Sequence, residues 1–187
     1  MKKIVLVVLM LAYASAAHAG LNLEGKRDRQ GFFIGFGLGG GAMLLTGSGA
    51  SETKAAFLGD LRIGGGLNDK ILLMYDGSTD YTRADGINFN VYHNDFAAQF
   101  FVWEDFFLRP SLGAVIARAS TSVGGTTVAV DGKWSLGGSL ATGYEFRFGK
   151  YFALSPELLY RYAHIRGNGG SGNTHSFGAQ AGMSWYF

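Results

Sequence analysis

Charged residues placed two positions apart are the sequence feature with the clearest potential for chemistry. Asp60 and Arg62 form one such pair within an otherwise apolar stretch, and similar positions recur along the chain. Glu145 and Arg147 repeat this spacing, and four acidic residues and four arginines in all occupy the polar face of alternating stretches, with no lysine among them: Asp60, Asp95, Glu145, Glu157, Arg62, Arg109, Arg147 and Arg161. Arginine is favoured where charges are enclosed and paired in fixed geometry, and enclosed charges require balance. The pattern predicts a network that either plugs an interior or lines a gated ion path.

A hydrolytic site is the second chemistry that the residue types could support. Three histidines follow residue 19, namely His93, His164 and His175, and Ser176 comes directly after His175. Adjacent residues of a strand point to opposite faces, so His175 and Ser176 form a poor catalytic pair. His164 lies near an expected loop. We therefore predict no catalytic residue and no enzymatic activity.

Metal and phosphate sites are not indicated. Asp76, Asp80 and Asp85 share one polar stretch, but their spacing does not fit a calcium loop of the EF-hand type, and we interpret them as solvated loop acids. The stretches GLGGG and GGGLND are not followed by a helix that could receive a phosphate. The chain has no cysteine and therefore no thiolate metal site. We expect no metal and no cofactor.

The elements that would position these side chains are β-strands. Apolar residues recur with period two in eight stretches: 31–45, 54–67, 71–82, 88–102, 106–118, 133–148, 151–164 and 175–187. The stretch 71–82 is apolar on both faces at first, so its register stays open. Tight turns alternate with polar connections of about 9 to 14 residues, which we expect to form four outward loops. This order predicts an all-β, eight-stranded antiparallel up-and-down barrel.

The alternation fits either of two barrels. A soluble barrel of the lipocalin type has an apolar interior, whereas a membrane barrel turns apolar side chains to lipid and polar ones to its lumen. Three features favour the membrane barrel. Its charged face lacks lysine, aromatic residues gather toward strand ends as in interfacial girdles, and glycines on the polar face would make room for arginines in a narrow lumen. These glycines are Gly35, Gly37, Gly39, Gly41, Gly64, Gly66, Gly113, Gly137, Gly143, Gly178 and Gly182.

The final stretch, HSFGAQAGMSWYF, keeps the alternation to the last residue, with Met183, Trp185 and Phe187 on the apolar face. It resembles the C-terminal signature of bacterial outer-membrane β-barrel proteins. Residues 30 to 187 resemble the small eight-stranded barrels, such as the OmpA transmembrane domain and OmpX. The resemblance implies that the barrel-assembly machinery reads the terminal strand and that outer-membrane lipids and lipopolysaccharide surround the barrel. No peptidoglycan-binding domain follows Phe187, which argues against a cell-wall tether.

The N-terminus predicts export. Lys2 and Lys3, a short apolar core and Ala17–His18–Ala19 are typical of a signal peptide over residues 1–19. An uncleaved anchor is the alternative, but ten apolar residues are too few to span a membrane. We then expect a periplasmic segment at 20–30 and the barrel domain at 31–187. Cleavage lowers Lys+Arg from 16 to 14, equal to Asp+Glu at 14, so nothing indicates nucleic-acid binding.

These observations predict a protein of the bacterial outer membrane with a plugged polar lumen. Its expected role is structural, or it presents surface loops to an extracellular partner. A narrow channel or transporter for small solutes is the alternative, and a lipid A-modifying enzyme is a third. The sequence identifies neither a ligand nor an oligomeric state.

Overall fold

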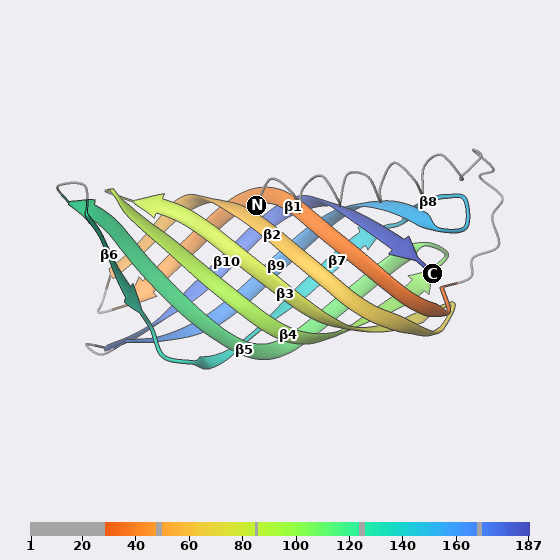
Figure 1. Cartoon of the computed structure of the whole chain (residues 1–187), viewed down its shortest axis with the longest axis horizontal. Coiled ribbons are helices and arrows are strands. Elements are labelled where there is room, and N and C mark those ends of the chain that lie inside the picture. The colour runs from red at the N-terminus through yellow and green to blue at the C-terminus, as the bar shows by residue number, and fades with distance from the viewer. Residues whose placement is uncertain (1–28, 48–49, 85, 124–125, 168–169) are drawn as a thin grey trace.

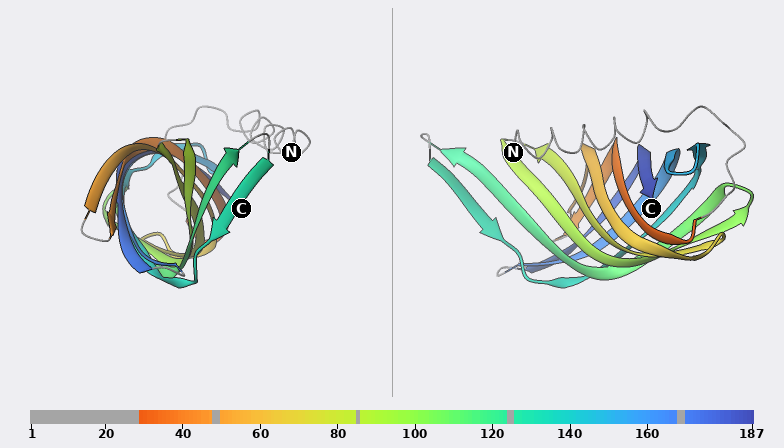
Figure 2. Two further views of the ribbon diagram at one scale, coloured as in Figure 1. Left: turned by 90° about the vertical axis from the view of Figure 1, so that its left-hand side faces the viewer. Right: turned by 45° about the vertical axis from the view of Figure 1, so that its right-hand side comes forward.

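The described strands form one antiparallel sheet that closes on itself (Figure 1). The computed structural model describes residues 29–47, 50–84, 86–123, 126–167 and 170–187. The strands are β1 (Gly31–Gly47), β2 (Ala50–Asn68), β3 (Ile71–Ala84), β4 (Ile87–Trp103), β5 (Phe106–Val123), β6 (Thr126–Asp131), β7 (Ser135–Tyr144), β8 (Phe146–Phe148), β9 (Phe152–Gly167) and β10 (Gly170–Tyr186). Because β1 pairs with both β2 and β10, the first and last strands complete the ring. The end-on view in Figure 2 shows this closure.

Ten strand segments make eight strands of the ring. β6, β7 and β8 follow one another as segments of the sixth strand. β6 pairs with the C-terminal part of β5, from Arg118 onward. β7 continues along β5 from Ser135, which lies opposite Val115. β8 keeps the register that β7 has along β9, since Gly143 lies opposite Glu157 and Phe146 opposite Leu154. The predicted eight-stranded up-and-down barrel is therefore confirmed.

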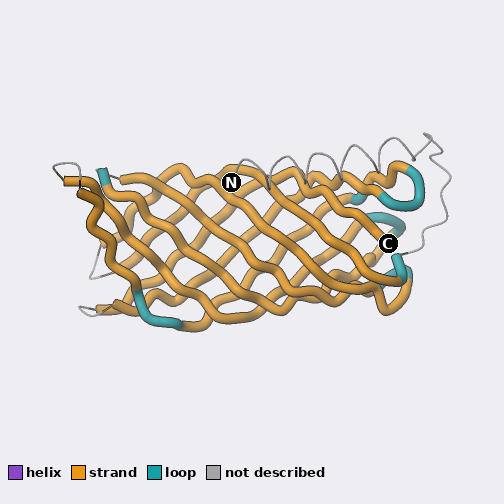
Figure 3. Tube along the Cα trace, viewed as in Figure 1, coloured by secondary structure: helices purple, strands orange, loops and turns teal. Residues whose placement is uncertain are grey.

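The long connections are shorter than the sequence predicts. Strand structure continues through most of the polar segments, and only two residues separate the strands of each hairpin at that end of the barrel. The prediction of four loops of about 9 to 14 residues is therefore wrong. Polar composition was the basis of that prediction, but strands can continue beyond the membrane wherever their backbones pair across a hairpin. Figure 3 shows strand along almost the whole described trace.

The two faces of the barrel differ as the alternation predicts. Large apolar side chains such as Leu112, Leu158 and Phe96 are exposed on the outside, where lipid would cover them. The inside holds the buried polar and charged residues. The open register of the third strand is settled: Leu72, Met74 and the even-numbered residues after them point inward. None of the described residues belongs to a helix long and apolar enough to cross a membrane.

The lumen is filled in layers along the barrel axis. Near the tight turns an apolar and aromatic cluster includes Phe33, Phe101, Phe107 and Tyr186. The middle of the barrel contains most of the buried charges. Toward the two-residue hairpins a second apolar cluster follows, formed by Met43, Ala56, Leu58, Val91, Val115, Ala117, Ala141, Leu159 and Ala163. The charged layer therefore lies between two apolar layers inside the wall of strands.

Candidate functional site

The centre of the charged layer is Glu157 on β9, which receives hydrogen bonds from two arginines. Arg62 on β2 donates from Nη1 to Oε1 at 2.8 Å, and Arg109 on β5 donates from Nη2 to Oε2 at 2.6 Å. Ser155 and Gln180 also donate to this carboxylate, at 3.0 and 2.8 Å. Both oxygens of a buried carboxylate are thus occupied by donors, which compensates for its removal from water.

The network extends from Glu157 to the opposite wall. Arg62 Nε lies 3.0 Å from Asp60 Oδ1, and Asp60 Oδ2 lies 3.4 Å from Arg161 Nη2. Arg161 Nη1 in turn lies 2.5 Å from Asp80 Oδ1. These contacts join strands β2, β3 and β9 across the lumen, so one chain of alternating charges spans the interior. Asp60, Arg62, Arg109, Glu157 and Arg161 thus come together in the lumen.

Asp76 and Asp80 were predicted to be solvated loop acids, and this prediction is wrong. Both lie on β3, buried in the lumen, because that strand continues to Ala84. Asp80 pairs with Arg161, while Asp76 Oδ2 lies 3.9 Å from Arg109 Nε. Asp85, the third acid of that stretch, lies outside the described residues.

Asp95 joins the layer without an arginine partner among the described residues. Its Oδ2 accepts a hydrogen bond from Ser111 at 2.5 Å, and it lies opposite Asp76 in the β3–β4 register. His93, also buried, has its Nε2 3.9 Å from Asp80 Oδ2. In the described middle layer five carboxylates therefore face three guanidinium groups: Asp60, Asp76, Asp80, Asp95 and Glu157 against Arg62, Arg109 and Arg161. Carboxyl groups therefore outnumber guanidinium groups in this layer, unlike in the balanced set expected from the sequence.

Glu145 and Arg147 form a separate cluster at the tight-turn end. Glu145 Oε1 lies 3.3 Å from Arg147 Nη1 and 3.1 Å from Arg29 Nε, and Tyr186 donates to its Oε2 at 2.6 Å. Arg29 also lies 2.5 Å from Asp105 and has its guanidinium 3.5 Å from the centre of the Phe101 ring. The eight predicted charges thus divide between two layers and do not form one continuous set.

Arg29 is a member of the network that sequence reasoning missed, because it was assigned to the segment 20–30. A signal was present: residue 29 has the same parity as Phe33, Gly35 and Gly37, which face the lumen from β1. The predicted signal peptide, residues 1–19, lies outside the described residues, as do residues 20–28.

Glycines make the space that the charged layer occupies. A Cβ at Gly37 would lie 2.6 Å from the Asp60 carboxylate and from the Gln180 amide nitrogen. A Cβ at Gly182 would collide with the Glu157 carboxylate and lie 2.8 Å from an Arg62 nitrogen. The predicted role of polar-face glycines therefore holds at these two positions.

The histidines do not assemble a hydrolytic site in the described part of the chain. His175 points outward from β10, where its Nδ1 lies 2.9 Å from the Tyr160 hydroxyl, whereas Ser176 is buried in the lumen. His164 Nδ1 contacts the Asn173 side chain at 2.9 Å. No group of three or more His, Cys, Asp or Glu among the described residues has the geometry to hold a metal ion.

The residues of the terminal strand lie where the barrel closes. Trp185 packs between two aromatic rings, with centroids 6.0 Å from Phe36 and 5.1 Å from Phe152. Met183 lies opposite Phe36 in the β1–β10 register. Phe187 is 66% exposed, although its backbone amide donates to Phe32 O at 2.9 Å. These residues seal β10 against β1, and their role as an assembly signal stays a prediction.

No protein-family model matches the chain, and no curated protein matches its sequence. Solved structures do match. The crystal structure of Neisserial surface protein A matches with a TM-score of 0.62 and 18% identity, over 83% of this chain and 97% of that one. Ail, the attachment invasion locus protein of Yersinia pestis, in complex with the heparin analogue sucrose octasulfate, matches with a TM-score of 0.53 and 18% identity, over 81% and 98%.

The chain has the fold of the small outer-membrane β-barrels. Outer-membrane barrels of this size have an outward apolar band and an interior narrow enough for side chains to fill. Both properties are present here, in the exposed apolar residues of the outer face and in the layered lumen. The predicted fold class is thus confirmed by the closed ring and by the neighbouring structures together.

Proposed function

We propose that the protein is an outer-membrane barrel with a closed lumen, whose role in the cell envelope is structural or one of surface contact. The observation that carries this proposal is the filling of the lumen. Side chains that are almost wholly buried occupy each layer: Phe33 and Phe107 near the turns, Arg109 and Glu157 in the middle, and Leu58 toward the outer end. A conducting pore would require a continuous water-filled path between these layers.

Conductance across a planar bilayer tests the closed lumen. Wild-type protein, Arg62→Ala and Glu145→Ala would be refolded and compared under the same voltage. We expect all three to be silent, because each substitution affects a single layer and the apolar layers remain. Discrete openings in the wild type that either substitution alters would contradict the proposal and support a narrow channel.

The excess of carboxylates in the middle layer is the observation that favours the channel alternative. If the lumen opened, five carboxylates against three guanidinium groups would attract cations and repel anions. Any openings should therefore be cation-selective, as measured by the reversal potential in a salt gradient. Anion-selective openings would show that the ions do not pass through this carboxylate-rich layer.

The outward hairpins are the surfaces that could contact an external partner. The β5–β6 hairpin is the clearest of them, because β6 pairs with β5 alone among the described strands and has its other edge unpaired. Unpaired strand edges are templates for adding a partner's strand. On this proposal lipopolysaccharide would surround the barrel, and the assembly machinery would act on its last strand during biogenesis.

The proposed role is not enzymatic. It is supported by the separation of His175 and Ser176 on opposite faces of β10 and by the position of Glu157 inside the lumen. An enzyme acting on lipid A would need its acid, base and nucleophile where lipid can reach them. Mass spectrometry of lipid A from cells with and without the protein tests this directly, and a shift in mass that depends on the protein would contradict it.

A further inference from the structure

The end of the barrel that carries the two-residue hairpins, called the mouth below, has apolar side chains on its inner face. Leu45 on β1, Phe89 on β4 and Ile165 on β9 all share the lumen parity of their strands, and they pack on the second apolar cluster. Above them, Val128 and Val130 of β6 lie opposite Thr121 and Ala119 of β5 in the register. The two valines are 54% and 63% exposed. The inner face of this end of the barrel therefore carries apolar side chains from four strands.

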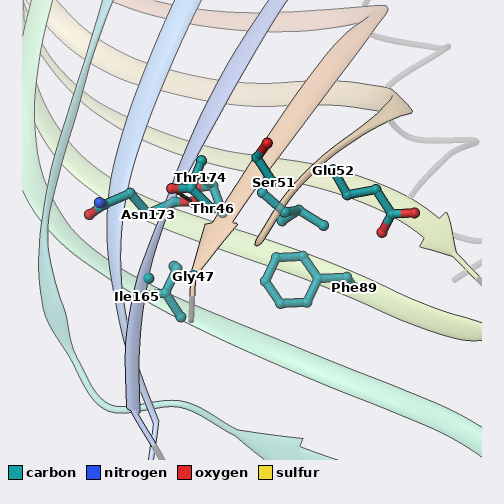
Figure 4. Close-up of a pocket in the computed structure, with 10 residues that line it drawn as sticks. Thr46, Gly47, Ser51, Glu52, Phe89, Ile165, Asn173 and Thr174 are labelled. Carbon is teal, nitrogen blue, oxygen red and sulfur yellow. Dashed lines mark hydrogen bonds between the residues drawn. The ribbon is translucent and has the colours of Figure 1, made fainter. Parts of the chain in front are cut away.

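Leu45, Phe89 and Ile165 line a cavity of about 390 Å³ at the ends of β1, β2, β9 and β10 (Figure 4), whereas Val128 and Val130 are not part of its lining. Its wall contains Leu45, Phe89 and Ile165. Its rim is polar, and is lined by Thr46, Ser51, Glu52, Asn173 and Thr174. Small-molecule sites are clefts of about 300–1,000 Å³ with a mostly apolar wall and a few polar groups that orient the ligand. The cavity meets this description.

The cavity has a closed floor. Met43, Leu58 and Val91 are wholly buried directly below Leu45 and Phe89, in the second apolar cluster. A solute that entered from outside would therefore stop at this level, above the charged layer. An apolar cavity that is closed at its inner end can hold a solute, but it provides no path for ions.

We propose that this mouth, defined by Leu45, Phe89, Ile165 and the polar rim, binds a small apolar solute with one aromatic ring or a short alkyl chain. The apolar wall faces the barrel interior and not the bilayer, because Leu45, Phe89 and Ile165 share the lumen parity of their strands and pack on the second apolar cluster. A partner's helix, about 10–12 Å across with its side chains, is too wide for a cavity of this volume. Glu52 on β2 and Thr174 on β10, which share the lumen parity of their strands, could hydrogen-bond a polar group at one end of the solute. This inference goes beyond the proposed function and rests on its closed lumen, because the apolar cluster below the mouth forms the floor of the site.

Protection of an introduced cysteine tests the proposal, since the natural chain contains none. Leu45→Cys places a thiol in the wall, and Ser171→Cys places one on an exposed position of the same end outside the cavity. Each variant in lipid nanodiscs would react with a water-soluble maleimide at increasing concentrations of indole as the probe. At an indole concentration about four times its dissociation constant, labelling of Leu45→Cys should slow about fivefold, because the free fraction falls as 1/(1+[L]/Kd). Labelling of Ser171→Cys should not change.

Two further variants keep the test decisive. Ile165→Cys replaces Leu45→Cys if the latter does not fold, and it should be protected equally because it lines the same wall. Adding Phe89→Asn to the cysteine variant should abolish protection by removing the aromatic part of the wall. The proposal is overturned if indole at its solubility limit slows neither wall cysteine, or slows the wall and Ser171→Cys equally.

Discussion

Arg62 and Glu157 form a 2.8 Å ion pair in the middle of the barrel, although 95 positions separate them in the sequence. The pair joins β2 to β9 across the lumen, and Arg109 holds the other oxygen of the same carboxylate at 2.6 Å. A single carboxylate thus ties three strands on different sides of the ring. This makes Glu157 and its arginines the structural centre of the polar interior.

Loss of Arg62 should destabilise the barrel strongly. Arg62→Ala leaves Asp60 and Glu157 buried with less compensation, and breaking a buried pair from one side costs about 3–5 kcal/mol. The free energy of unfolding in urea, measured in lipid vesicles, would give this value. Arg118→Ala is the matched control, because the Arg118–Asp131 pair is 3.4 Å long but largely exposed. Its cost should be about 0–1 kcal/mol, and equal losses for the two variants would contradict a buried network.

Gly182→Ala should also be destabilising, although it adds one methyl group. Its Cβ would collide with the Glu157 carboxylate and displace the Arg62 side chain. Overpacking of this kind costs about 1–3 kcal/mol. Gly40→Ala is the control on β1, where the nearest atom to a Cβ is Ala56 O at 3.5 Å, and we expect a change within about 0.5 kcal/mol. A neutral Gly182→Ala in the same unfolding measurement would show that the charged layer is loosely packed.

Lipid contact of the outer face can be tested with a charge. Leu112 is 70% exposed on the outside, midway along the part of β5 that pairs with β7. Leu112→Arg should destabilise the folded barrel in lipid by about 2–4 kcal/mol, as for arginine at a bilayer midplane. Val102→Arg, beside the tight turn after β4, should cost about 0–1 kcal/mol because it lies near the interface. The reverse order would place the membrane band elsewhere on the barrel.

Alternation predicted the strands and divided their residues between two faces, because each residue's side is set by the parity of its position. Asp60 and Arg62 were placed on one face in this way, and the absence of lysine, the glycines of that face and the positions of the aromatic residues assigned it to the lumen. Their partners could not be assigned, since Arg62 meets Glu157 through ring closure, which local sequence does not encode. Parity also showed that His175 and Ser176 face opposite sides.

The errors arose where composition was preferred to parity. Asp76 and Asp80 occur in a polar stretch and were interpreted as loop residues, yet both keep the inward parity of β3. Arg29 keeps the inward parity of β1 but precedes the first apolar run, so it was left out. In both cases the strand extends further than its apolar residues do. Ile165 of the apolar mouth was missed for the same reason, because it follows the predicted strand 151–164 and was included in an expected loop.

The terminal residues allow assembly and stability to be separated. Phe187 is largely exposed and contacts Phe32 at its edge, with ring centroids 6.0 Å apart. Trp185 is only 9% exposed and packs against Phe36 and Phe152. Unaided refolding of Phe187→Ala into vesicles should therefore give nearly wild-type stability, whereas Trp185→Ala should lose about 3–5 kcal/mol, as expected for a buried tryptophan.

Assembly in cells should respond differently to the same two variants. If the terminal aromatic residue is read by the assembly machinery, Phe187→Ala should reduce the amount of folded barrel in the outer membrane despite its normal stability. The measurement is the folded fraction in membrane preparations, compared with the stability of each variant in vesicles. Phe187→Ala that accumulates like the wild type would show that this residue is no assembly signal in this protein. A Phe187→Ala barrel as unstable in vesicles as Trp185→Ala would instead assign the residue to packing between β1 and β10.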